Sequence, residues 1–286
     1  MANASGNHLG AFLTAVSALA FVINDAAMKW VLEFIPLFQA LVVRGVIAVP
    51  LICFTMLITR QLITSLSRND AQLIALRTLS EIGTTYFLLM SLKNMPISHV
   101  TLILQAAPLG LTLVAALMMG ELVTWRRWSA IVLGFIGVII IIRPGTAEFS
   151  PYAFFAVLTV ICIVIRDMVT RRISPEIPSL PIAGLTAVTI MVLGLVMMPT
   201  VEPVMPTLLH LVLVSVAAVA ILIAYLLSVQ IMRLGHVGFV AQFRYTAAVW
   251  SIILGFLLFG EIPDEWTVTG ALLIMATGIY TLRADR

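Results

Sequence analysis

The chain has 286 residues, of which 62% are hydrophobic and 10% charged, with a net charge of +3 and a mean hydropathy of +1.13. Soluble domains carry about 25% charged residues, so this composition excludes an ordinary soluble protein. The net charge is small and the chain has no basic block, so we expect no nucleic-acid partner.

Ten apolar runs predict ten membrane-spanning helices, because each run approaches the ~20 residues that a helix needs to cross a bilayer. In chain order the predicted helices cover 8–30, 36–58, 70–93, 97–119, 125–143, 151–172, 178–199, 207–233, 236–259 and 265–283. The connections are short and leave no room for a soluble domain. The first run lacks the basic start and the cleavage site of a signal peptide, so we expect it to stay as a span.

The chain repeats its landmarks about 140 residues apart, which predicts two related halves, 1–145 and 146–286. The equivalent pairs are Asp25 and Asp167, Pro36 and Pro178, Glu121 and Glu261, and Arg143 and Arg283. Each half holds five predicted spans, and an odd number of spans turns the second half upside down. Such inverted repeats are typical of transporters, whose sites lie near the midplane where the repeats meet.

The basic residues predict the orientation of the bundle. With the N-terminus inside, the cytoplasmic turns hold nine arginines and the opposite turns hold only three basic residues. Cytoplasmic loops carry the excess of Lys and Arg, so we expect both termini in the cytoplasm. The cytoplasmic set is Arg60, Arg68, Arg126, Arg127, Arg171, Arg172, Arg233, Arg283 and Arg286, and the opposite set is Lys29, Lys93 and Arg143.

Short motifs recur in both halves. The first half has Ile97-Ser98-His99-Val100, Gln105-Ala106-Ala107-Pro108 and Gly120-Glu121, and the second has Gly238-Phe239-Val240-Ala241 and Gly260-Glu261. A glycine–glutamate pair before a glycine-bearing helix, found twice, resembles the ten-helix EamA branch of the drug/metabolite transporter superfamily. The second half departs from the first, because Ala248 stands where the first half has Pro108.

A finer resemblance concerns the end of the chain. Its motifs are Phe243-Arg244-Tyr245-Thr246, Phe259-Gly260-Glu261-Ile262-Pro263-Asp264 and Gly278-Ile279-Tyr280-Thr281-Leu282. They look like a bacterial subgroup described as riboflavin or S-adenosylmethionine uptake carriers. The resemblance implies a small-molecule metabolite as substrate.

Ionisable residues inside apolar spans are the first candidates for a site, because each costs about 2.5–3.5 kcal/mol on insertion scales. Arg44 and Arg244 cannot lose their charge, so we expect them to hold an anionic or carbonyl-bearing part of a substrate. The predicted substrate-binding residues are Arg44, Glu81, Tyr86, Gln105, Tyr225, Gln242, Arg244, Tyr245 and Trp250. The candidate proton-coupling residues are Glu81, Asp25 and Asp167. We expect no metal and no cofactor.

Structural interpretations of the same residues stay open. Arg77 and Glu81 share a helix face and can form an ion pair. Arg44 and Arg244 can instead pair with Glu81 or Asp25. The remaining structural alternatives are contacts of Asp25 with Lys29 and of Asp167 with Arg171 or Arg172, and capping of the next helix by Glu121 and Glu261.

These observations predict a secondary transporter rather than an enzyme. We expect it to move a small polar or amphiphilic metabolite, riboflavin-, S-adenosylmethionine- or amino-acid-like, across the bacterial inner membrane by alternating access. No GxxxxGK[ST] motif indicates direct use of ATP. The alternatives are a lipid-handling intramembrane protein (a flippase or a lipid-modifying enzyme) and an accessory subunit. The expected partners are the metabolite and the lipid bilayer, and we expect a monomer or a homodimer.

Overall fold

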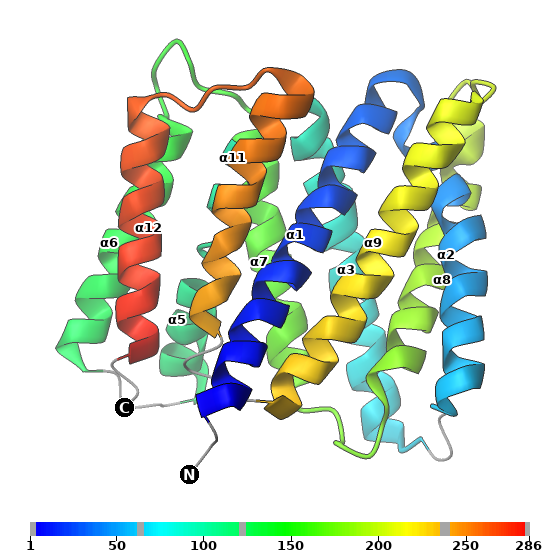
Figure 1. The fold of residues 1–286 in the computed structure, drawn as a ribbon, viewed down its shortest axis with the longest axis horizontal. Coiled ribbons are helices and arrows are strands. Elements are labelled where there is room, and N and C mark those ends of the chain that lie inside the picture. The colour runs from blue at the N-terminus through cyan, green and yellow to red at the C-terminus, as the bar shows by residue number, and fades with distance from the viewer. Residues whose placement is uncertain (1–3, 62–65, 120–123, 235–240, 284–286) are drawn as a thin grey trace.

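The computed structural model describes residues 4–61, 66–119, 124–234 and 241–283. Nearly all of these residues are helical, and the helices lie side by side in one bundle (Figure 1). The elements are α1 (Ala4–Phe34), α2 (Leu37–Thr59), α3 (Arg68–Asn94), α4 (Ile97–Leu104), α5 (Ala107–Met119), α6 (Trp125–Ile142), α7 (Ala153–Thr170), α8 (Ser179–Met197), η1 (Met198–Thr200), α9 (Leu208–Leu234), η2 (Ala241–Tyr245), α11 (Thr246–Phe259) and α12 (Glu265–Arg283). The predicted all-α membrane fold is confirmed.

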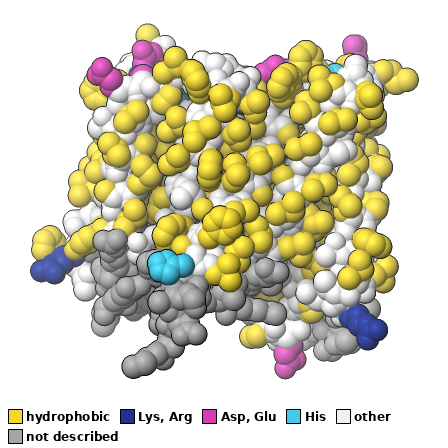
Figure 2. Space-filling model, in the orientation of Figure 1, with side chains coloured by type: hydrophobic (Ala, Val, Ile, Leu, Met, Phe, Trp, Pro, Cys, Tyr) yellow, Lys and Arg dark blue, Asp and Glu magenta, His cyan; other side chains and the backbone are white. Residues whose placement is uncertain are grey.

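Eight helical segments in the described part of the chain are long and apolar enough to cross a membrane. A shorter apolar stretch, Trp128–Ile142, lies in α6, which packs against α12. Apolar side chains cover the middle of the face seen in Figure 2, and the charged side chains visible there lie toward its two ends. The number of ten spans therefore stays a prediction for α6 and α12.

The main contacts between helices are symmetric with respect to the two halves. The repeat makes α7, α8, α9 and α12 the equivalents of α1, α2, α3 and α6. α1 packs along α9, and its equivalent α7 packs along α3. α2 packs on its own equivalent α8, and α6 on α12. Each of these main contacts is therefore matched when the halves are exchanged, as an inverted repeat requires.

The fourth predicted span, 97–119, is not one continuous helix, which corrects the sequence-based expectation. α4 ends at Leu104 and α5 begins at Ala107. Pro108 explains the break, because its ring clashes with the carbonyl of Leu104 and it has no amide hydrogen to donate. At the equivalent place of the second half, the 3-10 helix η2 leads into α11, although Ala248 replaces the proline. The first part of the ninth predicted span, 236–240, lies outside the described residues.

Glycines allow α6 and α12 to approach closely. A Cβ atom on Gly270 would lie 2.7 Å from the carbonyl oxygen of Gly137 and 2.6 Å from Cγ1 of Ile141. A Cβ on Gly137 would lie 3.0 Å from the carbonyl oxygen of Gly270. These distances leave no room for a side chain between the two backbones.

Gly270→Leu is therefore expected to destabilise the protein by about 1–3 kcal/mol, because a leucine in a filled space forces the two helices apart. Thermal unfolding of the purified protein in detergent measures the effect. Ala276→Leu, on the exposed side of the same helix, is the matched control and should change stability by less than ~0.5 kcal/mol. Equal effects of the two leucines would contradict the close packing of α6 on α12.

The N- and C-terminal helices begin and end at the same end of the bundle (Figure 1). The turn that contains Arg171 and Arg172 lies at this end, and the turn after α6, which contains Arg143, lies at the other. This arrangement agrees with the distribution of basic residues that predicts cytoplasmic termini.

We expect a cysteine at Asn69 to be protected from an impermeant thiol reagent added outside intact spheroplasts, and a cysteine at Thr146 to react. Both positions are exposed and lie at opposite ends of the bundle. The background carries Cys53→Ala and Cys162→Ala, since both native thiols are free. The reverse labelling pattern would invert the predicted orientation.

Candidate functional site

A charged cluster in the middle of the bundle joins the two halves of the chain. Glu81 lies 13 residues from either end of α3 (81 − 68 = 94 − 81) and is only 6% exposed. Its carboxylate is 3.2 Å from Nη1 of Arg166 on α7. Tyr225 of α9 donates its hydroxyl to the same carboxylate over 3.3 Å. Three helices from two halves thus meet at one buried carboxylate.

Arg166 is shared between two carboxylates. Its Nη2 lies 2.9 Å from Oδ1 of Asp167, the next residue of α7, and its Nε donates to the same oxygen over 2.9 Å. One guanidinium therefore compensates Glu81 and Asp167 together. Removing the Arg166 guanidinium would leave both carboxylates without the cation that offsets their lost hydration.

Arg77 does not form the ion pair with Glu81 that their four-residue spacing allows. Its Nη1 instead donates to Oγ1 of Thr186 on α8 over 3.0 Å. Thr186 is the repeat equivalent of Arg44 (186 − 44 = 142). The alternative of a local Arg77–Glu81 pair is thus wrong, and the partner of Glu81 comes from the other half.

Asp25 and Arg44 complete the cluster from the first half. Asp25 of α1 accepts a hydrogen bond of 2.9 Å from Nδ2 of Asn24. Arg44 lies next to Leu41, Gly45 and Ala48 on the buried side of α2. Its charge acts on Asp25, Glu81 and Tyr225, yet among the described residues its guanidinium makes no hydrogen bond and no direct ion pair. The predicted direct pairing of Arg44 with either carboxylate is therefore wrong.

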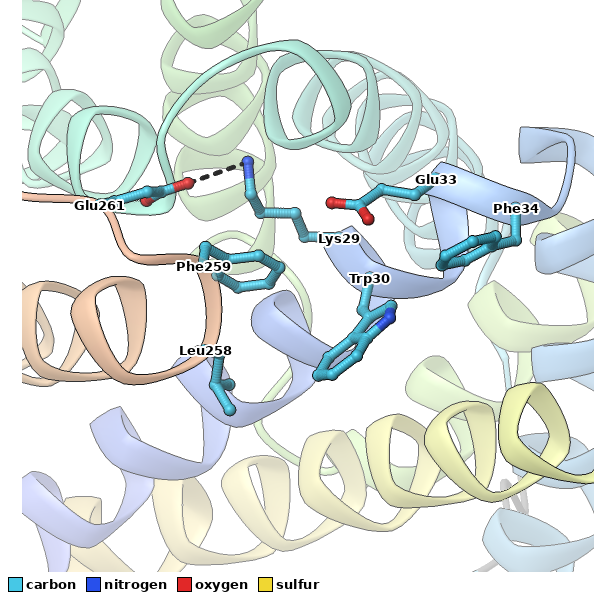
Figure 3. A pocket seen from close by; sticks show the side chains of 7 residues that line it. All are labelled: Lys29, Trp30, Glu33, Phe34, Leu258, Phe259 and Glu261. Carbon is cyan, nitrogen blue, oxygen red and sulfur yellow. Dashed lines mark ion pairs between the residues drawn. The ribbon is translucent and has the colours of Figure 1, made fainter.

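A second charged network contains the Lys29–Glu261 pair, which is drawn in Figure 3. Lys29 of α1 is 8% exposed, and its Nζ lies 3.2 Å from Oε1 of Glu261. The same ammonium donates to the carbonyl oxygens of Leu92 and Met95, over 2.9 Å and 2.6 Å. Glu261 also accepts from the amide of Ile97 over 2.8 Å. The network links α1 and the α3–α4 connection to the turn after α11.

Two sequence-based interpretations of this network are corrected. Glu261 caps a helix, as predicted, but the helix is α4 of the other half and not the following α12. Lys29 pairs with Glu261 and not with Asp25 one turn away. Glu121, the repeat equivalent of Glu261, lies outside the described residues.

Asp264 caps α12 in place of Glu261. It accepts a hydrogen bond of 3.0 Å from the amide of Thr267, and it also pairs with Arg143. Partial burial raises the pKa of this carboxyl, but hydrogen bonds from Thr267 and Arg143 outweigh burial and lower the pKa to about 2. Since this pKa lies below that of an unfolded Asp, the contact stabilises the fold above about pH 4 and is lost as the pH falls toward 2.

A cavity of about 490 Å³ lies beside the Lys29–Glu261 pair. Trp30 and Phe259 form an edge-to-face contact in its wall, with ring centroids 6.3 Å apart. The Lys29 ammonium lies 5.2 Å from the centroid of Phe259. The lining residues are Lys29, Trp30, Glu33, Phe34, Leu258, Phe259 and Glu261, all labelled in Figure 3.

Three predicted site residues pack within the bundle, away from the contacts of the charged cluster. The Tyr86 ring stacks on Phe38, with centroids 6.3 Å apart. The Tyr245 hydroxyl is buried against Gly278 of α12 and has no hydrogen-bond partner among the residues that the structure describes. Trp250 of α11 donates its indole hydrogen to the carbonyl of Ala15 on α1 over 3.2 Å.

The predicted residues around the two helix interruptions also meet. Gln105, between α4 and α5, donates from Nε2 to the carbonyl oxygen of Arg244 over 3.1 Å. The Arg244 side chain is exposed, and Gln242 precedes it in η2. The contact joins the α4–α5 connection of the first half to η2 of the second half.

The sequence-based site residues include Asp25 and Asp167, as candidates for proton coupling or as partners of nearby basic residues, but they do not include Arg166. The repeat aligns Asn24-Asp25 with Arg166-Asp167. In the structure both pairs belong to the central cluster, one from each half. The signal available in the sequence was that the two pairs occupy equivalent positions of the repeat. An inverted repeat relates equivalent residues by an axis between the halves, where sites are found.

Comparison with known proteins identifies the family of this chain. The model of the EamA-like transporter family matches residues 8–143 and again residues 150–283. The S-adenosylmethionine uptake transporter of Rickettsia prowazekii is 24% identical over 193 residues, which cover 67% of this chain and 65% of that relative's length. The pseudopaline exporter CntI of Pseudomonas aeruginosa is 23% identical over 287 residues, covering 97% of each chain. One solved structure shares the fold with a TM-score of 0.67 at 18% identity, covering 96% of this chain and 99% of the other.

Proposed function

Because this chain belongs to the EamA-like transporter family, we propose that it is a secondary carrier for a small polar or amphiphilic metabolite in the bacterial inner membrane. The halves 1–145 and 146–286 rock against one another, so that a site between them opens to one side of the membrane at a time. Arg44, Glu81 and Tyr225 contact the substrate. Gln105, between α4 and α5, and Gln242, in η2, supply hydrogen bonds that orient the substrate.

The charged cluster between the halves is the main support for a substrate site there. Charged groups in a membrane bundle are costly, so they are kept where they face a water-filled path or serve a function. Glu81 and Arg166 come from different halves, 85 residues apart, and meet at 3.2 Å. Arg44 adds a charge that no direct partner among the described residues satisfies. The cluster can therefore bind a substrate, and its ion pair between the halves depends on their relative position.

The Lys29–Glu261 network would close the end opposite the termini. It crosses between the halves, because the Lys29 ammonium pairs with Glu261 and donates to two carbonyls of its own half. Opening at that end requires these contacts to break. Trp250 and Ala15 make a further cross-half contact on α11 and α1, at 3.2 Å.

Three carboxylates of the cluster are the candidates for proton coupling. Glu81 and Asp167 both pair with Arg166, whereas Asp25 has only the Asn24 amide as a hydrogen-bond donor within the described ranges. Glu81→Gln is therefore expected to act mainly on stability. A proton gradient that drives accumulation would act first through Asp25.

Counterflow in proteoliposomes tests the transport proposal. Vesicles preloaded with one unlabelled solute at a time receive labelled solute outside, using riboflavin, S-adenosylmethionine and the protein amino acids. Transient accumulation of at least one solute, abolished by dilution of the preload, is the expected result. Vesicles of the same composition with a fluorescent phospholipid test the lipid-handling alternative. Lipid flipping without counterflow of any solute would reject the metabolite carrier in favour of that alternative.

A further inference from the structure

Most charges of the central cluster already have direct protein partners. Arg166 contacts Glu81 and Asp167, and Tyr225 donates to Glu81. Arg77 donates to Thr186. These groups hold α3, α7, α8 and α9 together without any ligand.

Two opposite charges of the same cluster are left over. The Arg44 guanidinium makes no hydrogen bond or direct ion pair within the described ranges, although it is partly accessible. The Asp25 carboxylate has one hydrogen-bond donor, the side-chain amide of Asn24, and no direct cationic partner there. A third group is also unsatisfied, since Asn24 is 5% exposed and its Oδ1 atom has no partner.

The charges of Arg44 and Asp25 act on one another, but no ion pair joins the two side chains among the described residues. Buried charges without partners are unfavourable, and a buried acceptor without a donor adds to that cost. A ligand that carries both charges a few bonds apart satisfies all three groups at once. A simple anion would leave the Asp25 carboxylate without a cation and add a second negative charge near it. A simple cation would leave the Arg44 guanidinium without an anion and add a second positive charge near it.

We propose that the substrate enters this site as a zwitterion of the α-amino acid type. Its ammonium group donates to Asp25 and to Oδ1 of Asn24, and its carboxylate accepts from Arg44. The inference rests on the proposed transport function and names the substrate class of the same site. The remaining part of the substrate lies toward Tyr225, whose ring packs edge-on against Phe21.

Thermal shifts of the purified protein test the proposal with named probes. These are the twenty protein amino acids and S-adenosylmethionine, and for the tightest binder its des-amino acid and its decarboxylated amine. Stabilisation that saturates with the zwitterion is expected, with at least about tenfold weaker binding of either truncated analogue. Asp25→Asn should remove the preference for the zwitterion over the des-amino acid. Arg44→Gln should remove the preference over the decarboxylated amine.

Matched controls separate these effects from loss of charge in general. Glu202→Gln and Arg60→Gln change exposed residues outside the spans and should leave both preferences intact. Asn24→Ala is a milder variant in case Asp25→Asn does not fold. It should weaken binding of the zwitterion several-fold without affecting the des-amino acid.

Stabilisation by plain carboxylates or plain amines that is as strong as stabilisation by the zwitterions would reject the proposal. A lack of stabilisation by every probe would reject it too. Equal loss of both preferences in Asp25→Asn and in Arg44→Gln would also reject it. Zwitterion binding without counterflow in proteoliposomes would reject the carrier and keep the site. Counterflow of solutes without an ammonium–carboxylate pair would keep the carrier and reject the zwitterion.

Discussion

Arg166→Ala is expected to lower the free energy of unfolding by about 3–5 kcal/mol, the range for breaking a buried ion pair by removing one partner. Arg166 is the cation that contacts both Glu81 and Asp167, so alanine leaves two carboxylates without it. Thermal unfolding in detergent, followed by tryptophan fluorescence, measures the loss.

The opposite substitution should be milder. In Glu81→Gln, Arg166 keeps Asp167, and the new amide oxygen still accepts from the guanidinium. Adding Glu81→Gln to Arg166→Ala should recover part of the stability, because it removes one stranded carboxylate. Arg172→Ala, at an exposed position in the turn after α7, should change stability by less than ~0.5 kcal/mol. An Arg166→Ala protein as stable as the wild type would contradict the central ion pair.

Lys29→Met is expected to reduce counterflow by at least about tenfold, since the contact that closes one end of the carrier is lost. The substitution removes an ammonium with three acceptors and leaves the Glu261 carboxylate without its cation. A cysteine at Ser98, which is 2% exposed in α4 next to this network, should become reactive toward an impermeant reagent added outside.

Two comparisons make the Lys29 result specific. Glu261→Gln should be milder than Lys29→Met, because Lys29 keeps its carbonyl acceptors and the new amide oxygen still accepts from Ile97. Lys93→Met changes an exposed lysine near the same end and should leave counterflow and labelling unchanged. Equal behaviour of Lys29→Met and Lys93→Met would show that the network does not close that end.

The helix interruptions were only partly predictable. Pro108 marks the break between α4 and α5 along the chain, because its effect on the preceding turn is local. The equivalent region has the 3-10 helix η2 before α11 although Ala248 stands in place of the proline, and the Arg244 carbonyl there accepts a hydrogen bond from Gln105. No local residue of the second half marked this change of helix type.

The amino-acid sequence by itself determined the class and the plan of this protein. Composition and run length indicate a membrane bundle, and a constant offset between landmarks indicates a duplicated unit. Both signals are written along the chain and do not depend on which helices become neighbours. The same holds for the distribution of basic residues between the two ends.

Only the tertiary structure decided which charges meet. Glu81 has Arg77 four residues away, yet it pairs with Arg166, 85 residues along the chain. Lys29 is one turn from Asp25, yet it pairs with Glu261, 232 residues away (261 − 29). Helical spacing makes a local pair available, but burial between helices determines which partner lies close enough to offset the lost hydration.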